Sequence, residues 1–314
     1  MVYKSSKSNL ILPNTFIVGV AKSGTTSIFD WLADHPEVCG SREKEAYYLC
    51  DKGNPLMNSK FNYYKNGLEG YSHFFQHYDS KKHKVILEGS PSYFYEDTPL
   101  KVIASFNPHA QIIIILRKPS ARVYSSYQFA RNTMSQIDHN MSFSKFIETC
   151  REYAGKPLMD HKTINTLGFN SIEGSRYANF MHKWLATFDR NNIHVYLTEE
   201  FSNPLKLMKC ISKDIGINSS FWDTYKFERK METYLIKNQF LHRVVLYLFR
   251  SYLKFNLPRS WINAFENTYL NINTQQLPPI GNCESKILKK LDVEFIPDNE
   301  ELERMLDIKL LEWK

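Results

Sequence analysis

The chain has 314 residues, of which 43% are hydrophobic and 23% charged, with only 12 Gly and 13 Pro, which excludes the disordered, collagen-like and low-complexity classes. The 40 Lys and Arg residues outnumber the 33 Asp and Glu residues, and the net charge of +7 favours an anionic ligand. The sequence has no Lys/Arg run of the kind that binds nucleic acids, so we expect no nucleic-acid partner.

Cysteine usage and hydropathy indicate the cytoplasm. The five cysteines form no CxxC pair, which fits a reducing compartment, and we expect them to be buried and unpaired. They are Cys39, Cys50, Cys150, Cys210 and Cys283. Aliphatic runs such as 112–116 are far shorter than the ~20 residues of a membrane span. Pro13 interrupts the N-terminal apolar stretch, so we expect no signal peptide.

Short apolar runs alternate with helical patterns along the chain. The predicted strands are residues 16–20, 84–87, 111–116 and 194–197. The predicted helices are residues 25–33, 120–131 and 175–188. Because strands that alternate with helices form parallel sheets, we predict the α/β class, with a central parallel sheet flanked by helices in three layers.

The later segments are less regular. Residues 132–172 are polar and predict a helix flanked by long surface loops that border a substrate cleft. Residues 233–265 contain no Asp or Glu and allow three interpretations: a packed helix pair with a basic rim, a surface for an anionic glycan, or a peripheral membrane element. Apolar positions on many sides of 240–249 favour burial. Asp298 is predicted to cap a C-terminal helix with the apolar stripe Leu302, Met305, Leu306 and Leu310.

The first chemical motif is Gly19-Val-Ala-Lys-Ser-Gly-Thr-Thr26, between a predicted strand and a predicted helix. The backbone N–H groups of such a loop and the helix N-terminus make an anion site, so a P-loop-like fold is expected. Gly19 and Gly24 have the Walker A spacing, but Thr25 occupies the lysine position and the lysine is Lys22. This displacement disfavours a P-loop small-molecule kinase, which stays as an alternative.

The second motif runs from Arg117 to Tyr127, directly after the predicted strand 111–116. Ligands of parallel sheets bind at the carboxyl ends of strands. Pro119 is well placed to start a helix, so Arg117 lies at the mouth of the strand and Ser125 about two turns into the helix. We expect both side chains to reach one further phosphate.

Together the two motifs resemble those of the sulfotransferases that use 3′-phosphoadenosine 5′-phosphosulfate (PAPS), in particular the glycan-modifying branch typified by heparan sulfate sulfotransferases. Four further stretches are similar to that branch: Ser41–Tyr48, Glu88–Tyr93, Gly174–Glu200 and the acidic C-terminal helix that ends at Trp313. The resemblance implies one sulfotransferase domain over residues 1–314. Its nucleotide-binding and catalytic core is 14–216, its variable helical acceptor-side region 217–284 and its C-terminal helix 285–314.

The resemblance also implies a role for each matching residue. The residues that hold the 5′-phosphosulfate would be Lys22, Ser23, Gly24, Thr25, Thr26 and Ser27. Arg117 and Ser125 would hold the 3′-phosphate, Glu45 would be the catalytic base and Lys22 would stabilise the leaving group. The implied reaction transfers a sulfuryl group from PAPS, as co-substrate and without a metal, to a hydroxyl, in preference to an amine, of a carbohydrate or glycoconjugate.

One position departs from the pattern. Gly89 stands where many glycan sulfotransferases carry a second lysine, which places the stabilisation of the transition state in doubt. Ser90, Ser92 or Lys44 are the candidate replacements, and the sequence does not choose among them. The departure also leaves open a non-catalytic relative that only binds nucleotide or glycan.

Overall fold

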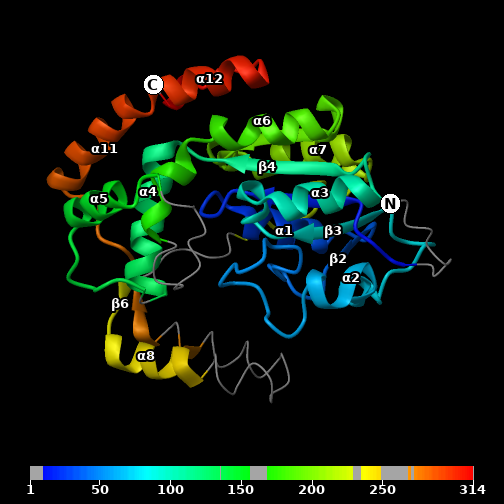
Figure 1. The fold of residues 1–314 in the computed structure, drawn as a ribbon, viewed down its shortest axis with the longest axis horizontal. Coiled ribbons are helices and arrows are strands. Elements are labelled where there is room, and N and C mark those ends of the chain that lie inside the picture. The colour runs from blue at the N-terminus through cyan, green and yellow to red at the C-terminus, as the bar shows by residue number, and fades with distance from the viewer. Residues whose placement is uncertain are drawn as a thin grey trace.

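The computed structural model describes residues 10–134, 136–155, 168–228, 235–248, 268–269 and 272–313 (Figure 1). Its centre is a five-stranded parallel sheet of order β2-β3-β1-β4-β5. The strands are β1 (Thr15–Gly19), β2 (Val38–Gly40), β3 (Val85–Gly89), β4 (Gln111–Leu116) and β5 (Ile193–Leu197). The predicted α/β class with a central parallel sheet is therefore confirmed.

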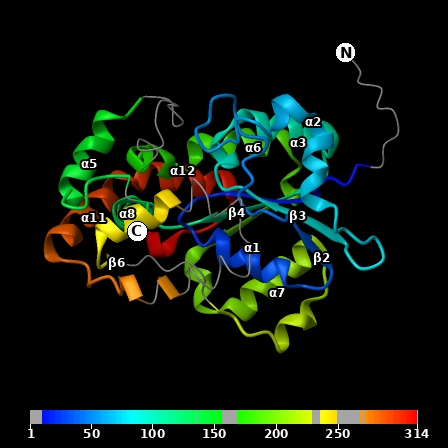
Figure 2. The same cartoon turned by 90° about the horizontal axis from the view of Figure 1, so that it is seen from below.

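Helices cover both faces of the sheet (Figure 2). Because side chains alternate along a strand, Ile113 and Ile115 of β4 pack with α1 (Thr25–Ala33) and α7 (Pro204–Ile215), and Ile112 and Ile114 pack on the other face. That second face is covered by α3 (Asp97–Phe106), α6 (Ala178–Thr187) and α12 (Ile296–Leu306). These two covered faces make the three layers that the sequence predicts.

A third group of helices lies beside the sheet (Figure 1). It consists of α4 (Pro119–Gln128), α5 (Phe143–Glu152) and α11 (Asn282–Glu294), whose apolar side chains form one cluster. The remaining described helices are α2 (Tyr63–Ser72) and α8 (Gln239–Leu248), and β6 (Leu235–Ile236) pairs with β7 (Thr274–Gln275). Residues 156–167 of the predicted loop region lie outside the described residues.

The C-terminal helix is predicted incorrectly in two respects. Residues 285–314 contain the end of α11 and a separate α12, and α12 begins at Ile296, two residues before Asp298. Pro297 explains the earlier start, because proline is favoured in the first helical turn. Asp298 therefore caps nothing and instead accepts a hydrogen bond from Arg176 Nη1 at 2.5 Å. The predicted stripe is buried at Leu302, Leu306 and Leu310, as expected.

The expected burial of residues 240–249 is confirmed at Val245 but wrong at several other apolar positions that the structure describes. Phe240 is 78% exposed, and Leu241 and Leu248 are exposed as well. Among the described side chains of α8, His242 and Val245 are buried, and His242 contacts the carbonyl of Thr133. The remainder of segment 233–265, at 233–234 and 249–265, lies outside the described residues.

The sequence predicts buried, unpaired cysteines, and the structure confirms this only in part. All five cysteines are free, and Cys39, Cys50 and Cys150 are buried as predicted. Cys210 and Cys283 are exposed, so burial is wrong for these two. Among the helices in the described ranges, none has the length and apolar character to cross a membrane.

Candidate active site

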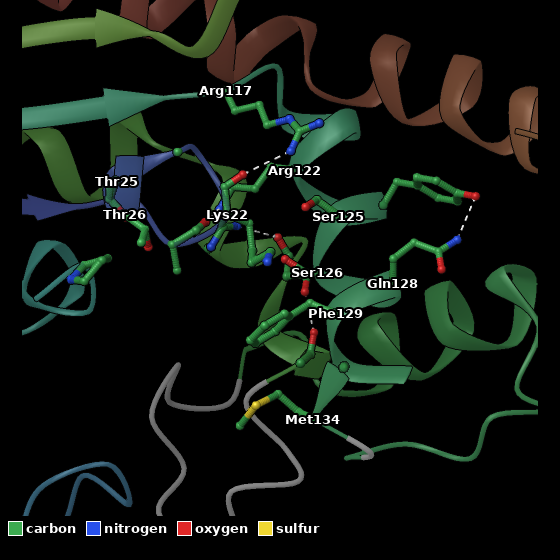
Figure 3. A pocket seen from close by; sticks show the side chains of 18 of the residues that line it. Lys22, Thr25, Thr26, Arg117, Arg122, Ser125, Ser126, Gln128, Phe129 and Met134 are labelled. Carbon is green, nitrogen blue, oxygen red and sulfur yellow. Dashed lines mark hydrogen bonds between the residues drawn. The ribbon is translucent and has the colours of Figure 1, made fainter. Parts of the chain in front are cut away.

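A cavity of about 1210 Å³ lies where β1, β3 and β4 reach their carboxyl ends (Figure 3). It brings together the two phosphate motifs and the predicted base, although they are far apart in the sequence. The predicted residues that line it are Lys22, Gly24, Thr25, Thr26, Ser27, Glu45, Arg117 and Ser125. The segment Thr274–Leu277 also lines it, as does Ile280. Within the described ranges, no group of His, Cys, Asp or Glu side chains is arranged to hold a metal ion.

The loop after β1 has the backbone of an anion site. Gly24 stands at the N-terminus of α1 with a φ of 87°, and no side chain caps the helix. A helix N-terminus without a side-chain cap suits an anionic ligand. A Cβ at Gly24 would lie 2.3 Å from Phe201 Cε2, so glycine is required by space as well as by φ. Ser23 is the one predicted phosphate-binding residue that does not line the cavity. It is fully buried, and its Oγ has no hydrogen-bond partner in the described structure.

Three consecutive carbonyl groups of this loop are bound by side chains from other segments. Arg122 Nε donates to the carbonyl of Ala21 at 3.0 Å, and Arg117 Nη1 donates to that of Lys22 at 3.1 Å. The hydroxyl of Thr198, after β5, lies 3.0 Å from the carbonyl of Ser23. These contacts fix the loop against the ends of β4, α4 and β5.

Lys22 places its ammonium on the cavity wall. Its Nζ lies 3.7 Å from the centre of the Phe129 ring (Figure 3). Burial, followed by the nearby charge of Arg117, lowers the pKa of Lys22 from 10.5 to about 8, although Glu45 acts in the opposite direction. An anion bound beside Lys22 would offset the cost of burying its ammonium and raise the pKa again, so the site suits a negatively charged group.

Arg117 and Ser125 lie on the part of the cavity wall formed by the end of β4 and by α4 (Figure 3). Tyr177 Oη donates to the carbonyl of Arg117 at 2.7 Å and fixes its backbone. The predicted start of the helix at Pro119 is confirmed, and it carries Ser125 to the same cavity as Arg117. This arrangement brings the two residues together as the sequence predicts.

Arg122 is a cavity residue that the sequence analysis missed. It is 6% exposed, and its Nη1 donates to the carbonyl of Ser171 and to Ser175 Oγ. It precedes Ser125 by three residues, a spacing that places both on one face of α4. The three-residue spacing from Ser125, within the same motif, could have identified Arg122 as a cavity residue from the sequence.

Glu45 is held by its neighbours on both carboxylate oxygens. Lys44 Nζ forms an ion pair with Oε1, and Tyr47 Oη donates to Oε2 at 2.5 Å. The backbone N–H of Glu45 donates to the carbonyl of Gly89 at 2.9 Å, which fixes the residue at the end of β3. Burial and the adjacent Glu45 raise the pKa of Tyr47, so its phenol remains a proton donor to the carboxylate.

A buried acid, Glu88, is connected through Ser90 to the loop that carries Glu45. Glu88 is fully buried, and Ser90 Oγ donates to its Oε1 at 2.6 Å. Burial raises the pKa of Glu88 to about 8, although the hydrogen bond from Ser90 acts in the opposite direction. The N–H of Tyr47 donates to Ser90 Oγ at 3.4 Å, which connects β3 to the loop of Glu45. The sequence analysis assigned no role to Glu88.

The absence of a side chain at Gly89 has a steric explanation. A Cβ at this position would lie 2.7 Å from Cδ2 of Phe29, a buried side chain of α1. We expect Gly89→Ala to lower the free energy of unfolding by about 1–3 kcal/mol, measured by urea denaturation, because the ring has to move. Gly174→Ala is the control, since its Cβ would meet atoms only at 3.5 Å or more. Equal stability of the two variants would contradict this explanation.

The comparisons with known proteins identify the family of the chain. The sulfotransferase domain family matches residues 12–242. Relatives include the bifunctional heparan sulfate N-deacetylase/N-sulfotransferase 4 of Mus musculus, 26% identical over 67% of this chain and 23% of that protein. Another is the membrane-associated sulfotransferase kil1 of Dictyostelium discoideum, 31% identical over 45% of this chain and 30% of that protein. The matches thus span less than a third of either relative's length.

A solved structure shows the same fold. The sulfotransferase from Alicyclobacillus acidocaldarius superimposes with a TM-score of 0.65 at 20% identity, covering 96% of this chain and 99% of that one. The family match over most of the chain shows that the chain belongs to the sulfotransferase domain family, and its relatives include bifunctional heparan sulfate N-deacetylase/N-sulfotransferases.

Proposed function

We propose that this protein transfers the sulfuryl group of PAPS to a hydroxyl of a carbohydrate or glycoconjugate. The observation that carries the proposal is the single cavity shared by the anion loop, the Arg117 and Ser125 pair, and Glu45. Two separate phosphate-binding elements suit a donor that has phosphate groups on both its 3′ and its 5′ side. A carboxylate on the same cavity suits an acceptor that has to lose a proton.

The donor side of the reaction follows from the loop. The N–H groups at the start of α1 and the side chain of Lys22 would bind the 5′-phosphosulfate, and Arg117 with Ser125 would bind the 3′-phosphate. When the bond between sulfur and the bridging oxygen breaks, its electron pair stays on the 5′-phosphate. Lys22 stabilises the charge that develops there.

The acceptor side depends on Glu45. A new bond forms between the acceptor oxygen and sulfur, in line with the breaking bond, while Glu45 takes the hydroxyl proton. An amine acceptor is the alternative, suggested by the N-sulfotransferase named among the relatives. A screen of hydroxyl-bearing and amine-bearing oligosaccharides with labelled PAPS separates the two.

The proposal is tested by the 3′-phosphate. We expect the protein to bind adenosine 3′,5′-bisphosphate about tenfold to a hundredfold more tightly than 5′-AMP in calorimetric titrations, and Arg117→Ala to remove that preference, because an arginine–phosphate contact is a strong charge-assisted hydrogen bond. Arg151→Ala, at an exposed ion pair with Glu294, is the control and should keep the preference.

Two other outcomes of these titrations have a clear meaning. If ATP binds best and Arg117→Ala changes nothing, both phosphate assignments are wrong and the kinase alternative replaces them. If Arg117→Ala weakens the bisphosphate and 5′-AMP equally, Arg117 acts only through its bond to the Lys22 carbonyl and does not bind the 3′-phosphate.

A cytoplasmic location is also part of the proposal. Its support is that all five cysteines are free. Segment 233–265 remains the proposed place of any peripheral membrane contact, supported by the exposed apolar side chains of Phe240, Leu241 and Leu248 on α8.

A further inference from the structure

Few of the cationic side chains that line the cavity are available to bind the sulfuryl group of the proposed donor. Among the described residues, the cations that line the cavity are Lys22, Arg117 and Arg122. Arg122 is already bound to three protein acceptors, and Arg117 is assigned to the 3′-phosphate. A transferring sulfuryl group spreads negative charge over its outer oxygens, and Lys22 is directed to the bridging oxygen on the other side of the sulfur. A second cation is therefore needed near Glu45.

The structure decides among the three candidates that the sequence leaves open. Ser90 is fully buried and its hydroxyl is committed to Glu88. Ser92 lines the cavity but brings no charge, and its hydroxyl lies 3.5 Å from the Cys50 sulfur. A lysine at position 89 would displace Phe29. Lys44 is the remaining candidate, and it is cationic.

Lys44 lies beside a residue of the cavity wall, Glu45, although it does not itself line the cavity. Its side chain is only 16% exposed, and its ammonium is bound to Oε1 of Glu45, which itself lines the cavity. Its charge acts on Lys22, whose pKa it lowers, and also on Glu88 behind the loop. The ammonium is thus bound to the proposed base, and its charge also acts on the proposed leaving-group residue.

The geometry points to Lys44 as the residue that binds the outer sulfuryl oxygens of the donor, in place of the lysine that Phe29 excludes from position 89. This inference rests on the proposed function. Lys44 and Tyr47 bind the two oxygens of Glu45. When the sulfuryl oxygens accept hydrogen bonds from Lys44, Oε1 of Glu45 becomes available for the acceptor proton.

The transfer step forms one bond, breaks one bond and moves one proton. The acceptor oxygen forms its bond to sulfur, the bond from sulfur to the bridging oxygen breaks, and the electron pair of that bond goes to the 5′-phosphate. The hydroxyl proton goes to Oε1 of Glu45, and Lys44 remains an ammonium throughout. Donor binding thereby makes the base competent, so the donor must bind before the acceptor can react.

The test compares PAPS with adenosine 3′,5′-bisphosphate, which lacks the sulfuryl group. Equilibrium dissociation constants for both are measured on the wild type, Lys44→Met, Lys44→Arg and the control Lys82→Met, whose lysine is exposed beside Asp79. We expect Lys44→Met to weaken PAPS by about tenfold or more relative to the bisphosphate, whose affinity stays within about twofold, and Lys44→Arg to recover part of the loss.

Each other result has one interpretation. If Lys44→Met leaves the ratio of the two affinities unchanged, Lys44 only holds Glu45 and the inference is overturned, even if transfer is slower. If it weakens both ligands equally, Lys44 supports the fold of the loop and the inference is again wrong. If the wild type binds neither ligand, the proposed function fails, which is distinguishable from a failure of Lys44 alone.

Discussion

Replacing Glu45 by Gln is expected to lower kcat for sulfuryl transfer by about 10²- to 10⁴-fold, the usual contribution of a general base. The amide keeps the size of the side chain but does not take a proton from the acceptor. The dissociation constant for adenosine 3′,5′-bisphosphate should change little, because the phosphate-binding groups are untouched. The measurement is the transfer of label from PAPS to the best acceptor of an oligosaccharide panel, together with calorimetric binding of the bisphosphate.

Glu43→Gln is the matched control, since this exposed carboxylate lies two residues away. It should transfer at the wild-type rate. A Glu45→Gln protein that keeps full activity would show that another group is the base. A wild type that binds the bisphosphate tightly but transfers to no acceptor would support the non-catalytic alternative.

Lys22→Met is expected to have two opposite effects. Transfer should fall by about 10²- to 10³-fold, because the leaving phosphate loses its cationic partner. The free energy of unfolding at pH 7 should rise by about 1–3 kcal/mol, because one pKa unit corresponds to about 1.4 kcal/mol and Lys22 has to stay charged in surroundings that lower its pKa from 10.5 to about 8. Such a gain of stability with loss of activity is typical of functional residues.

The pH dependence separates this cause from a general packing effect. A lysine whose pKa is lower in the folded state destabilises the fold below about pH 8, and this cost is relieved as pH rises towards 10.5. The stabilisation by Lys22→Met, measured by urea denaturation, should therefore shrink between pH 7 and pH 10. Lys101→Met, at an exposed lysine, is the control and should show no such change. A stabilisation that is constant with pH would count against the explanation by charge burial.

The parts of the fold that the sequence predicts are those with local causes. The run of β-branched residues at 112–115 favours a buried strand in a parallel sheet, and the spacing of Gly19 and Gly24 is typical of a phosphate loop between strand and helix. The helix at Thr25–Ala33 is predicted with its observed bounds. In these segments the backbone conformation of each residue follows from its neighbours in the sequence.

The parts that were missed depend on contacts between distant segments. Strand β2 has only three residues, too few to show a period, and exists because β3 pairs with it. The roles of Tyr47 and Glu88 depend on Glu45 lying beside the end of β3, which no local pattern reveals. The burial expected for α8 was wrong at Phe240, Leu241 and Leu248 for the same reason, since an apolar pattern does not tell which neighbours are present.

The three anchored carbonyl groups of the phosphate loop have a consequence for how this enzyme family can diversify. Because Ala21, Lys22 and Ser23 are each held by a side chain from a separate segment, the loop is already ordered before a nucleotide arrives. Little conformational entropy then has to be lost on donor binding. On the proposed function, the donor part of the cavity is therefore rigid, and sequence changes in other lining segments such as Thr274–Leu277 would alter acceptor preference at little cost to nucleotide affinity.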